Sequence, residues 1–248
     1  MMFDGILPVN KSRDVLSNSV VVKIKKIIKR SGIIVKVGHG GTLDKFASGL
    51  LLILIGKATK LFHEISVLDK SYEAVVKFGE LRDTDDIYGR VIEYSSTSHL
   101  DRKVVENALK NFEGEILQIP PAYSSVHING ERAYKLAKKD YYSTLKMLRP
   151  RKVNVYEIKL LNFDKDNSEA TIFVRCSGGT YIRSIARDLG YKLGAVAFLK
   201  ALTRKSIGGI SLDRAITDDL INSPQDIERN LISIEEFRKI FDFYSSAT

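Results

Sequence analysis

The chain has 248 residues, enough for one sizeable core, and its 39 lysines and arginines against 30 acids give a formal charge of +9. This balance suits a polyanionic partner without saying which one. The single cysteine, Cys176, excludes an internal disulfide and a cysteine-rich metal site, and no two of the four histidines are spaced as metal ligands. There is no signal-peptide pattern and no apolar run near the ~20 residues that cross a bilayer. We therefore expect a cytoplasmic protein with no metal, no cofactor and no membrane segment.

The chain opens with a predicted strand and an amphipathic helix. Residues 3–10 predict the strand. Residues 17–29 predict the helix, with Ser17 or Ser19 as its N-cap and Gly32 just beyond its end. Valines and isoleucines follow one side of this helix and lysines the other, so one face should be buried.

A glycine-rich bend with one acid comes next. Residues 33–37 predict a strand that leads into the bend, Asp44 lies within it, and six aliphatic residues, 50–55, follow. Such a short, wholly apolar run predicts a strand buried on both faces. In an arbitrary sequence an aspartate in such a turn most often only caps it. A P-loop is excluded because the spacing from Gly49 to Lys57 is wrong.

The middle of the chain alternates strands and helices. Residues 57–65 predict a helix, residues 70–78 a strand with one buried face, and residues 100–112 an amphipathic helix. The loop 79–89 holds three aspartates. Their spacing does not fit a calcium-binding loop, so we expect a solvated loop in which the acids cap turns.

A basic segment runs from Arg132 to Lys152, just after the turn signal Asn129-Gly130. Its cations interleave with three tyrosines, and Asp140 is the only acid inside it. Cations that neutralise phosphates and rings on which bases stack are what RNA binding requires. The alternative is a solvated lysine-rich face.

The last part of the chain predicts a hairpin and further helices. Residues 153–163 and 170–176 predict paired strands. A helix then runs to Leu193, with Arg183 and Arg187 on a face beside its apolar stripe. From about residue 212 onward, one or two short helices are expected.

Three stretches resemble the TruB family of tRNA pseudouridine synthases. Residues 38–51 match the family pattern Gly-His-x-Gly-x-Leu-Asp-x-x-Ala-x-Gly-x-Leu without a gap. Residues 176–183 match Cys-Ser-x-Gly-Thr-Tyr-Ile-Arg, and a weaker match is Leu202-x-Arg204 followed by Gly208. The opening also follows the family, but Ser12 and Asp14 stand where Pro and Gly are usual. The backbone conformation of that turn is therefore not predicted by the resemblance.

The resemblance covers residues 3–210 and implies an α+β pseudouridine synthase fold, with helices flanking a mixed, largely antiparallel central sheet. It implies a catalytic domain at residues 1–212, with an RNA-binding insertion at about 123–152. Residues 213–248 are expected to form a short helical tail. We expect the small RNA-binding domain that bacterial members carry at this end to be absent or vestigial.

The activity that the resemblance implies is isomerisation of uridine to pseudouridine, at uridine-55 in the T loop of tRNA, after the base has been flipped out. Asp44 is then the essential carboxylate and Arg183 its counter-charge. Tyr72 is the ring that stacks on the target base and helps to move the C5 proton. Whether Asp44 attacks C1′, adds to C6 or removes a sugar proton stays open.

The resemblance also implies residues that bind the substrate. His39 matches a residue that packs against the flipped bases, and Tyr181 and Leu202 match residues that line the base pocket. Without the family, a histidine at the position of His39, just before a Gly-Thr turn, is usually structural. The cations that we expect on RNA are Lys138, Lys139, Arg149 and Lys152. We expect a monomer whose partner is the T arm of tRNA.

Two other functional classes remain open at this point. One is a non-catalytic RNA-binding or RNA-folding module on the same fold. The other is a carboxylate-dependent hydrolase of nucleosides, which would need a second acid paired with Asp44. Only the aspartates at 83–86 could supply that acid.

Overall fold

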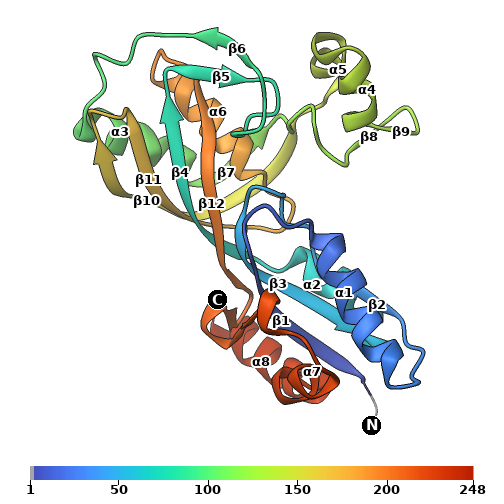
Figure 1. Ribbon diagram of the computed structural model, residues 1–248. Coiled ribbons are helices and arrows are strands. Elements are labelled where there is room, and N and C mark those ends of the chain that lie inside the picture. The colour runs from blue at the N-terminus through green and yellow to red at the C-terminus, as the bar shows by residue number, and fades with distance from the viewer. Residues whose placement is uncertain (1–2, 248) are drawn as a thin grey trace. The chain divides into compact units, whose positions relative to one another are not determined.

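The computed structural model describes residues 3–247, which divide into two compact units. The first unit combines the chain up to Tyr72 with the chain from Thr203 onward, and the second is Glu73–Leu202. Strands β4 (Lys70–Phe78) and β12 (Ala197–Ile207) carry the chain from one unit to the other. Both units contain mixed or antiparallel strands flanked by helices (Figure 1), so the α+β class is confirmed.

The first unit is built on β1 (Gly5–Lys11) and β3 (Ser48–Ile55), which pair in antiparallel fashion. Strand β1 also pairs parallel to β14, and β3 pairs parallel to the end of β12 and antiparallel to β2. The remaining elements of this unit are α1 (Ser17–Arg30), β2 (Val37–His39), η1 (Gly56–Leu61), α2 (Phe62–Val67), β13 (Ile210–Ser211), η3 (Leu212–Arg214), β14 (Ile216–Thr217), η4 (Asp218–Leu220), α7 (Pro224–Asn230) and α8 (Ile234–Ala247).

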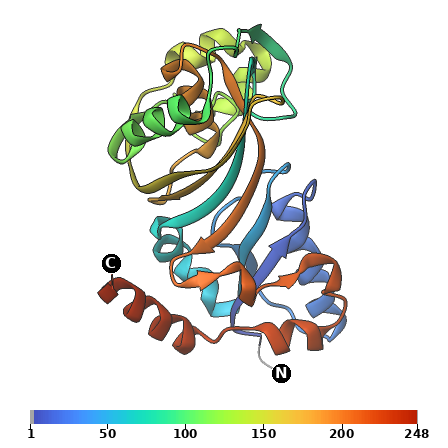
Figure 2. The same cartoon turned by 90° about the vertical axis from the view of Figure 1, so that its left-hand side faces the viewer.

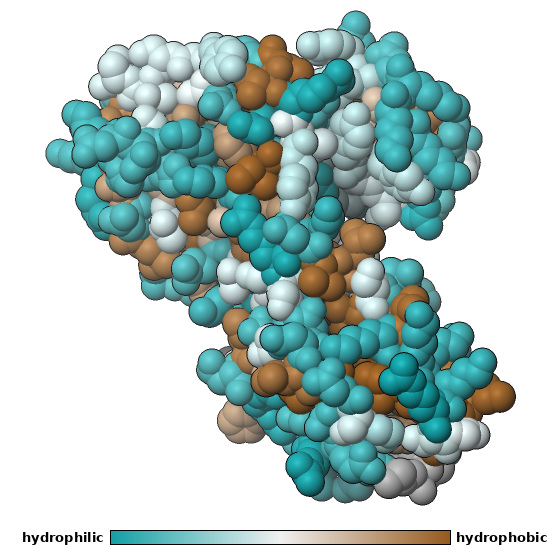
Figure 3. All heavy atoms as spheres, viewed as in Figure 1, coloured by the Kyte–Doolittle hydropathy of each residue, from teal (hydrophilic) through white to brown (hydrophobic). Residues whose placement is uncertain are grey.

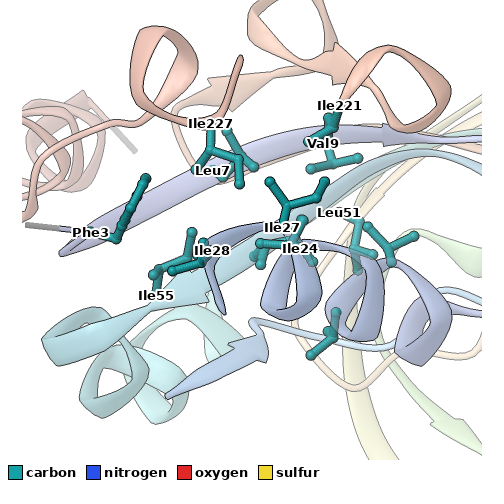
Figure 4. Packing of buried hydrophobic residues seen from close by; sticks show 13 residues of the cluster. Phe3, Leu7, Val9, Ile24, Ile27, Ile28, Leu51, Ile55, Ile221 and Ile227 are labelled. Atoms are coloured by element: carbon teal, nitrogen blue, oxygen red, sulfur yellow. The ribbon is translucent and has the colours of Figure 1, made fainter. Parts of the chain in front are cut away.

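Strand β3 is buried on both faces, as its sequence predicts. Its odd-numbered residues, such as Leu51 and Ile55, pack with Ile24 and Ile28 of α1 (Figure 4). Its even-numbered residues pack in a second cluster with Ile65 of α2 and other side chains. Because successive side chains of a strand point to opposite faces, a run of aliphatic residues alone can join two hydrophobic layers.

The last third of this unit is helical, as predicted. Helices α7 and α8 both contact β1, and Figure 2 shows them from a second side. Ile227 of α7 and Phe237 of α8 are buried in the two clusters that also contain β3. No helix in the described part of the chain is long and apolar enough to span a membrane.

Three sequence-based expectations for this unit need correction. Helix α1 begins at Ser17, but its N-cap position is Leu16 and no side chain caps it. Residues 33–36 are not a strand, since β2 begins only at Val37. The helix expected at 57–65 is two pieces, a 3-10 helix that continues into α2.

The second unit contains a sheet with the order β4-β11-β10-β7. The predicted hairpin is present as β10 (Arg151–Asp164) and β11 (Glu169–Cys176), and β7 (Gly114–Gln118) pairs antiparallel to β10. The other elements are β5 (Glu80–Arg82), β6 (Val91–Tyr94), α3 (Arg102–Leu109), η2 (Lys110–Phe112), β8 (His127–Ile128), β9 (Glu131–Arg132), α4 (Ala133–Lys139), α5 (Tyr141–Met147) and α6 (Ile182–Lys192).

Two local expectations for this unit were wrong. The segment expected to be a loop, 79–89, begins with β5, which pairs with β6. In α3 the residues Val105, Ala108 and Leu109 are buried, whereas Val104, which the helical spacing from Leu100 predicts on the apolar stripe, is exposed. The turn at Asn129-Gly130 is confirmed, because both residues have positive φ and connect β8 to β9.

The insertion between β7 and β10 has a small core of its own. Ala122, Ala133, Ala137 and Leu148 are buried in it, and Tyr141 packs against them. Tyr141 is therefore partly a core residue and not a free ring, whereas Tyr142 is exposed. Figure 3 shows hydrophilic side chains gathered over α4 and α5.

Candidate active site

The loop that carries Asp44 is held by a buried arginine. Arg204, only 2% exposed, lies on β12 and donates from Nε to the carbonyl oxygen of Leu50 at 2.7 Å. Its two Nη atoms donate to the carbonyl oxygens of Thr42 at 3.3 Å and Gly41 at 3.1 Å. One planar guanidinium thus ties the start of the loop to the first residues of β3. Gly49, with φ of 104°, lets the two backbones approach, because a Cβ there would lie 2.4 Å from the carbonyl oxygen of Arg204.

A buried lysine holds the other end of the same loop. Lys11 of β1 donates from Nζ to the carbonyl oxygens of Ala47 at 2.5 Å and Val15 at 2.8 Å, and more distantly to that of Lys45 at 3.5 Å. Burial lowers the pKa of Lys11 to about 8, although the nearby carboxylates of Asp218, Asp14 and Asp44 oppose that shift. The ammonium group therefore stays charged at neutral pH.

The middle of the loop is anchored by Ser17 and by apolar burial. Ser17 Oγ donates to the carbonyl oxygen of Leu43 at 2.7 Å and accepts from its amide at 3.0 Å, so this serine joins α1 to the loop instead of capping the helix. Leu43, Phe46 and Ala47 are buried. Asp44 lies between them and is half-buried. The sequence therefore presents this one carboxylate on a loop fixed on both sides.

The neighbouring turn departs from the family in sequence but keeps a left-handed residue. Asp14 has φ of 68°, a conformation that glycine adopts most easily and that aspartate and asparagine tolerate. Its amide donates to the carbonyl oxygen of Lys45 at 2.8 Å. Ser12 donates from Oγ to Asp218 at 2.5 Å, which ties the turn to η4.

His39 is the last residue of β2 and is half-buried. Burial and the charge of Arg204 lower the pKa of its imidazole, so the ring is neutral near pH 7. Its Nδ1 atom is buried and has no hydrogen-bond partner within the described chain. A neutral ring suits packing or stacking, which agrees with the role that the family resemblance implies.

Arg183 lies in the first turn of α6 and is 6% exposed. Its Nη1 atom donates to the carbonyl oxygens of Thr84 at 3.0 Å and Tyr123 at 3.2 Å, and lies 3.8 Å from a carboxylate oxygen of Asp86. Arg183 is therefore a buried residue and not a solvated arginine on the surface of the helix. The guanidinium is held by the loop after β5 and by the start of the insertion.

The three aspartates of that loop are buried, so the expectation of a solvated loop was wrong. Their role in capping turns is confirmed for two of them, because Asp83 accepts from the amide of Arg90 and Asp86 from that of Tyr88. Asp85, only 3% exposed and with φ of 57°, pairs with Nη1 of Arg187 at 2.9 Å. No group of three or more potential metal ligands was found within residues 3–247.

The Asp85–Arg187 pair supports Arg183 indirectly. Arg187 lies one helical turn after Arg183 and also donates to the carbonyl oxygen of Ile119 at 2.8 Å. The carbonyl oxygen of Asp85 accepts from the amide of Leu199 on β12 at 3.0 Å. The loop that contacts Arg183 is thereby fastened to both α6 and β12.

Burial raises the pKa of Asp85 to about 6, with the charges of Arg187 and Arg183 opposing the shift and that of Asp188 adding to it. As the pH falls through about 6, the carboxylate is protonated and its pair with Arg187 weakens. We expect the turnover of wild-type protein to fall in this range. We expect Asp85→Asn to lower turnover at pH 7.5 and to flatten this acid limb, in a pH profile of initial rates. Asp166→Asn, in the exposed β10–β11 turn, is the control; an unaltered profile in Asp85→Asn contradicts the assignment.

The same pKa shift predicts the opposite trend for stability. Because the folded state binds this proton more tightly than the unfolded state, the contribution of Asp85 to the free energy of unfolding decreases as the pH rises from 3.8 to about 6. Urea unfolding of the wild type and Asp85→Asn at several pH values measures this difference. A difference that does not vary over this range contradicts the shift.

Gln118 fixes the entrance to α6. Its Nε2 atom donates to the carbonyl oxygen of Tyr181 at 3.1 Å, and its Oε1 atom accepts from the amide of Tyr181 at 2.8 Å. The guanidinium of Arg151 lies over the Tyr181 ring at 5.8 Å, a cation–π contact. Leu202 of β12 is buried.

The four cations expected on RNA are all exposed, but two of them are paired. Lys139 lies 3.6 Å from Glu131, and Lys152 lies 2.8 Å from Glu115. Lys138 and Arg149 have no ion-pair partner in the described chain. Asp140, the acid inside the segment, caps α5 by accepting from the amide of Ser143 at 3.0 Å.

The site residues expected from the sequence are divided between the two units. Asp44, His39 and Tyr72 belong to the first, and Tyr72 is buried on β4. Arg183, Tyr181, Leu202 and the insertion belong to the second. The pairing of Asp44 with Arg183 stays a prediction.

Comparisons with known proteins decide the family. Residues 25–182 match the family described as TruB family pseudouridylate synthase (N terminal domain). The chain belongs to the TruB family of pseudouridylate synthases. It is 41% identical to the tRNA pseudouridine synthase B of Borreliella burgdorferi over 245 residues, which are 98% of this chain and 82% of that protein. It is 39% identical to the protein of that name from Clostridium acetobutylicum over 240 residues, or 96% and 79%.

Solved structures agree with the TruB assignment. A chain from a Cbf5–Nop10–Gar1 complex gives a TM-score of 0.65 at 28% identity, over 95% of this chain and 59% of that one. A chain from an H/ACA RNP bound to a substrate RNA containing 2′-deoxyuridine gives 0.61 at 26% identity, over 86% and 50%. The chain thus spans only half to three fifths of these two proteins. The pseudouridine synthase fold predicted from the sequence is confirmed.

The sequence did not predict that Lys11 holds the loop that carries Asp44, and it indicated Arg204 only as part of a weak motif. Both are charged residues that lie on strands and point into the core, which is rare for lysine and arginine. In the sequence, the only sign of their role is a charged residue at a position where the strand pattern predicts a buried side chain. The carbonyl partners of each come from residues up to 163 positions away, so no local pattern reveals them.

Removing the Arg204 guanidinium should destabilise the loop that carries Asp44. We expect Arg204→Met to lower the free energy of unfolding by about 3 kcal/mol or more, since each buried carbonyl left unpaired costs about 1–3 kcal/mol. Urea unfolding measures this. The control is Arg102→Met, at an exposed position of α3 that is paired with Glu106. Its free energy of unfolding should stay within about 0.5 kcal/mol of the wild-type value. Equal effects of both substitutions would contradict the role given to Arg204.

Proposed function

We propose that this pseudouridine synthase acts on tRNA and converts uridine-55 of the T loop to pseudouridine. The observation that carries the proposal is the family pattern at residues 38–51, which stands on a loop fixed by Arg204, Lys11 and Ser17. Relatives of about 40% identity over most of the chain are named tRNA pseudouridine synthase B, which supports tRNA as the substrate. Uridine-55 is the position that the family resemblance implies.

The reaction is an isomerisation that balances without any co-reactant. The bond between C1′ and N1 of the target uridine breaks, the base turns over, and a bond forms between C1′ and C5. The hydrogen on C5 leaves as a proton and N1 regains one. One carboxylate, a counter-charge and a site that excludes water are enough, so no metal or organic cofactor is needed in this scheme. Activity should therefore survive a chelator wherever the tRNA stays folded.

In this proposal Asp44 is the essential carboxylate. Its side chain is half-buried on a loop in which Leu43, Phe46 and Ala47 are buried, which supports a fixed position for it. Arg183 keeps the carboxylate ionised, as an opposite charge at short range does. Tyr72 stacks on the target base and helps to remove the C5 proton.

The remaining site residues hold the flipped nucleotide. A neutral His39 packs against the flipped bases, and Tyr181 and Leu202 line the base pocket. The fixed geometry of Tyr181 between Gln118 and Arg151 supports this role. Flipping costs a few kcal/mol, which these contacts offset.

The insertion at about 123–152 binds the T arm through its exposed cations, chiefly Lys138 and Arg149, with Lys139 and Lys152 partly neutralised by their acid partners. In this proposal the protein is a cytoplasmic monomer. Residues 1–212 form the catalytic domain, and residues 213–248 form a helical tail.

The test is to incubate the purified protein with an unmodified tRNA transcript and to map pseudouridine along it. We expect pseudouridine at position 55 and at no other uridine. A transcript with cytidine at position 55 is the control and should yield none. Pseudouridine at other positions alone would contradict the proposed site, and its complete absence would contradict the proposed substrate.

A further inference from the structure

The first unit carries a second concentration of positive charge, far from the insertion in sequence. Residues 15–43 contain six lysines or arginines and no acid. At 100° per residue, the outward side chains of α1 place four of these cations on one arc, opposite the buried face that contains Ile24 and Ile28. These four are Lys25, Lys26, Lys29 and Arg30.

Three more exposed cations, Lys36, Lys57 and Lys60, lie in the same unit on segments other than α1. The amide of Gly56 donates to the carbonyl oxygen of Lys36 at 2.8 Å, which places Lys36 beside Lys57 at the start of η1. Lys60 lies on the same 3-10 helix, and β2, which follows Lys36, packs against α1. We call the seven exposed residues Lys25, Lys26, Lys29, Arg30, Lys36, Lys57 and Lys60 the basic patch. Hydrophilic side chains cover much of the surface over α1 in Figure 3.

The charge of the basic patch is not neutralised by the protein. Within the described residues, none of the seven side chains forms an ion pair. Lys23, on the same helix, is excluded because it donates to the carbonyl oxygen of Asp218. Some exposed cations elsewhere have acid partners, as for Lys139 with Glu131 and Arg238 with Glu64. The four like charges on the outward face of α1 repel one another, and an anion relieves that repulsion.

The chemistry of the basic patch fits phosphate better than an acidic protein. Lysine is a compact charge that binds phosphate without a fixed geometry, and six of the seven residues are lysines. Protein interfaces are instead anchored by aromatic residues, and no aromatic residue other than His39 occurs between residues 15 and 43.

We propose that the basic patch binds the phosphate backbone of the substrate RNA, as a contact separate from the insertion. This inference rests on the proposed function, in which the substrate is an RNA. The patch lies in the same unit as Asp44. Binding phosphates there releases counterions from the RNA, so the affinity gained depends steeply on salt.

The test compares two variants with the same change in net charge. The patch variant is Lys25→Gln, Lys26→Gln, Lys29→Gln, Arg30→Gln, which keeps α1 intact because glutamine and lysine have similar helix propensities. The control variant replaces four exposed but ion-paired cations by glutamine: Arg102, Arg214, Arg238 and Lys239. Binding of an unmodified tRNA transcript is measured at several salt concentrations for wild type and both variants.

For the patch variant we expect Kd at low salt to rise about 10-fold or more, and the slope of log K against log[salt] to fall by roughly two to three. The control variant should keep the wild-type slope. A variant with Lys25, Lys26 and Lys29 replaced by arginine should keep that slope too, which separates loss of charge from loss of fold. Turnover at saturating tRNA should change less than about two-fold in every variant, since binding is spread over many cations.

Equal losses in the patch and control variants would overturn the proposal, because they would reflect net charge alone. It would also be overturned if the patch variant lost binding to vesicles of phosphatidylcholine with 30% phosphatidylserine but bound tRNA normally. The proposed function is tested separately. Wild-type protein that binds tRNA without forming pseudouridine would refute the activity, while the slopes of log K against log[salt] for the patch and control variants would still decide the role of the basic patch.

Discussion

Asp44→Asn is expected to abolish pseudouridine formation, with turnover lower by about 10⁴-fold or more, as when the reacting side chain of an enzyme is removed. Asparagine has nearly the same shape but carries no charge and cannot act as the essential carboxylate. Arg204, Lys11 and Ser17 bond backbone atoms of this loop, so those bonds should survive the substitution. Affinity for tRNA should stay within about three-fold, since it is distributed over many cations.

The matched control is Asp14→Asn, in the turn beside the same loop. Asparagine adopts the left-handed conformation of Asp14 readily, so the backbone should not change. This control should retain most of the wild-type turnover. Rates are measured in single turnover with the enzyme in excess, and substantial pseudouridine from Asp44→Asn would refute its role.

Arg183→Lys is expected to lower turnover by roughly 10²-fold, comparable to the loss of one preorganised donor in an active site. The guanidinium already donates to the carbonyl oxygens of Thr84 and Tyr123. A guanidinium can hold a carboxylate through two parallel hydrogen bonds, whereas an ammonium group of similar reach lacks this planar fork. Binding of tRNA should weaken only modestly.

Arg102→Lys, on the exposed side of α3, is the control and should leave turnover unchanged. The single-turnover rate and the dissociation constant of tRNA are measured for both variants. If Arg183→Lys turned over at nearly the wild-type rate, Asp44 and Arg183 would not form a functional pair.

The elements that the sequence predicts well are those with a strong hydrophobic pattern. The unbroken aliphatic run of β3 and the one-sided apolar face of α1 identify both elements and the faces that they bury. The hairpin of β10 and β11 follows from two β-rich runs around a polar turn. Their ends are less well predicted: residues 33–35 are apolar and were expected in a strand, but they form no strand ladder.

The polar interior could not be predicted from local patterns. Asp85 is buried because Arg187, 102 residues away, pairs with it, and three aspartates in one loop otherwise indicate a solvated turn. Ser17 or Ser19 was expected to cap α1, yet the hydroxyl of Ser17 bonds Leu43 across 26 residues. In both cases a distant partner determines the role of the side chain.

The candidate site was predicted from a family pattern and not from hydrophobic periodicity. The position of Asp44 in a family pattern identified it, whereas composition and periodicity alone favour a turn-capping aspartate. What the structure adds is the support: Arg204 and Lys11 fix the loop, and the loop after β5 fixes Arg183. Such support is made of bonds to backbone carbonyls, which leave no trace in the identity of the accepting residues.

Isomerisation of uridine within RNA can be measured with a tRNA transcript that carries tritium at C5 of its uridines. Because C5 exchanges its hydrogen for the bond to C1′, we expect release of about one tritium per tRNA into water, no free uracil, and no release by Asp44→Asn. Free uracil would show that the protein is a hydrolase, and bound tRNA with no release would show that it is a non-catalytic RNA-binding module. Either result would refute pseudouridine formation by this chain.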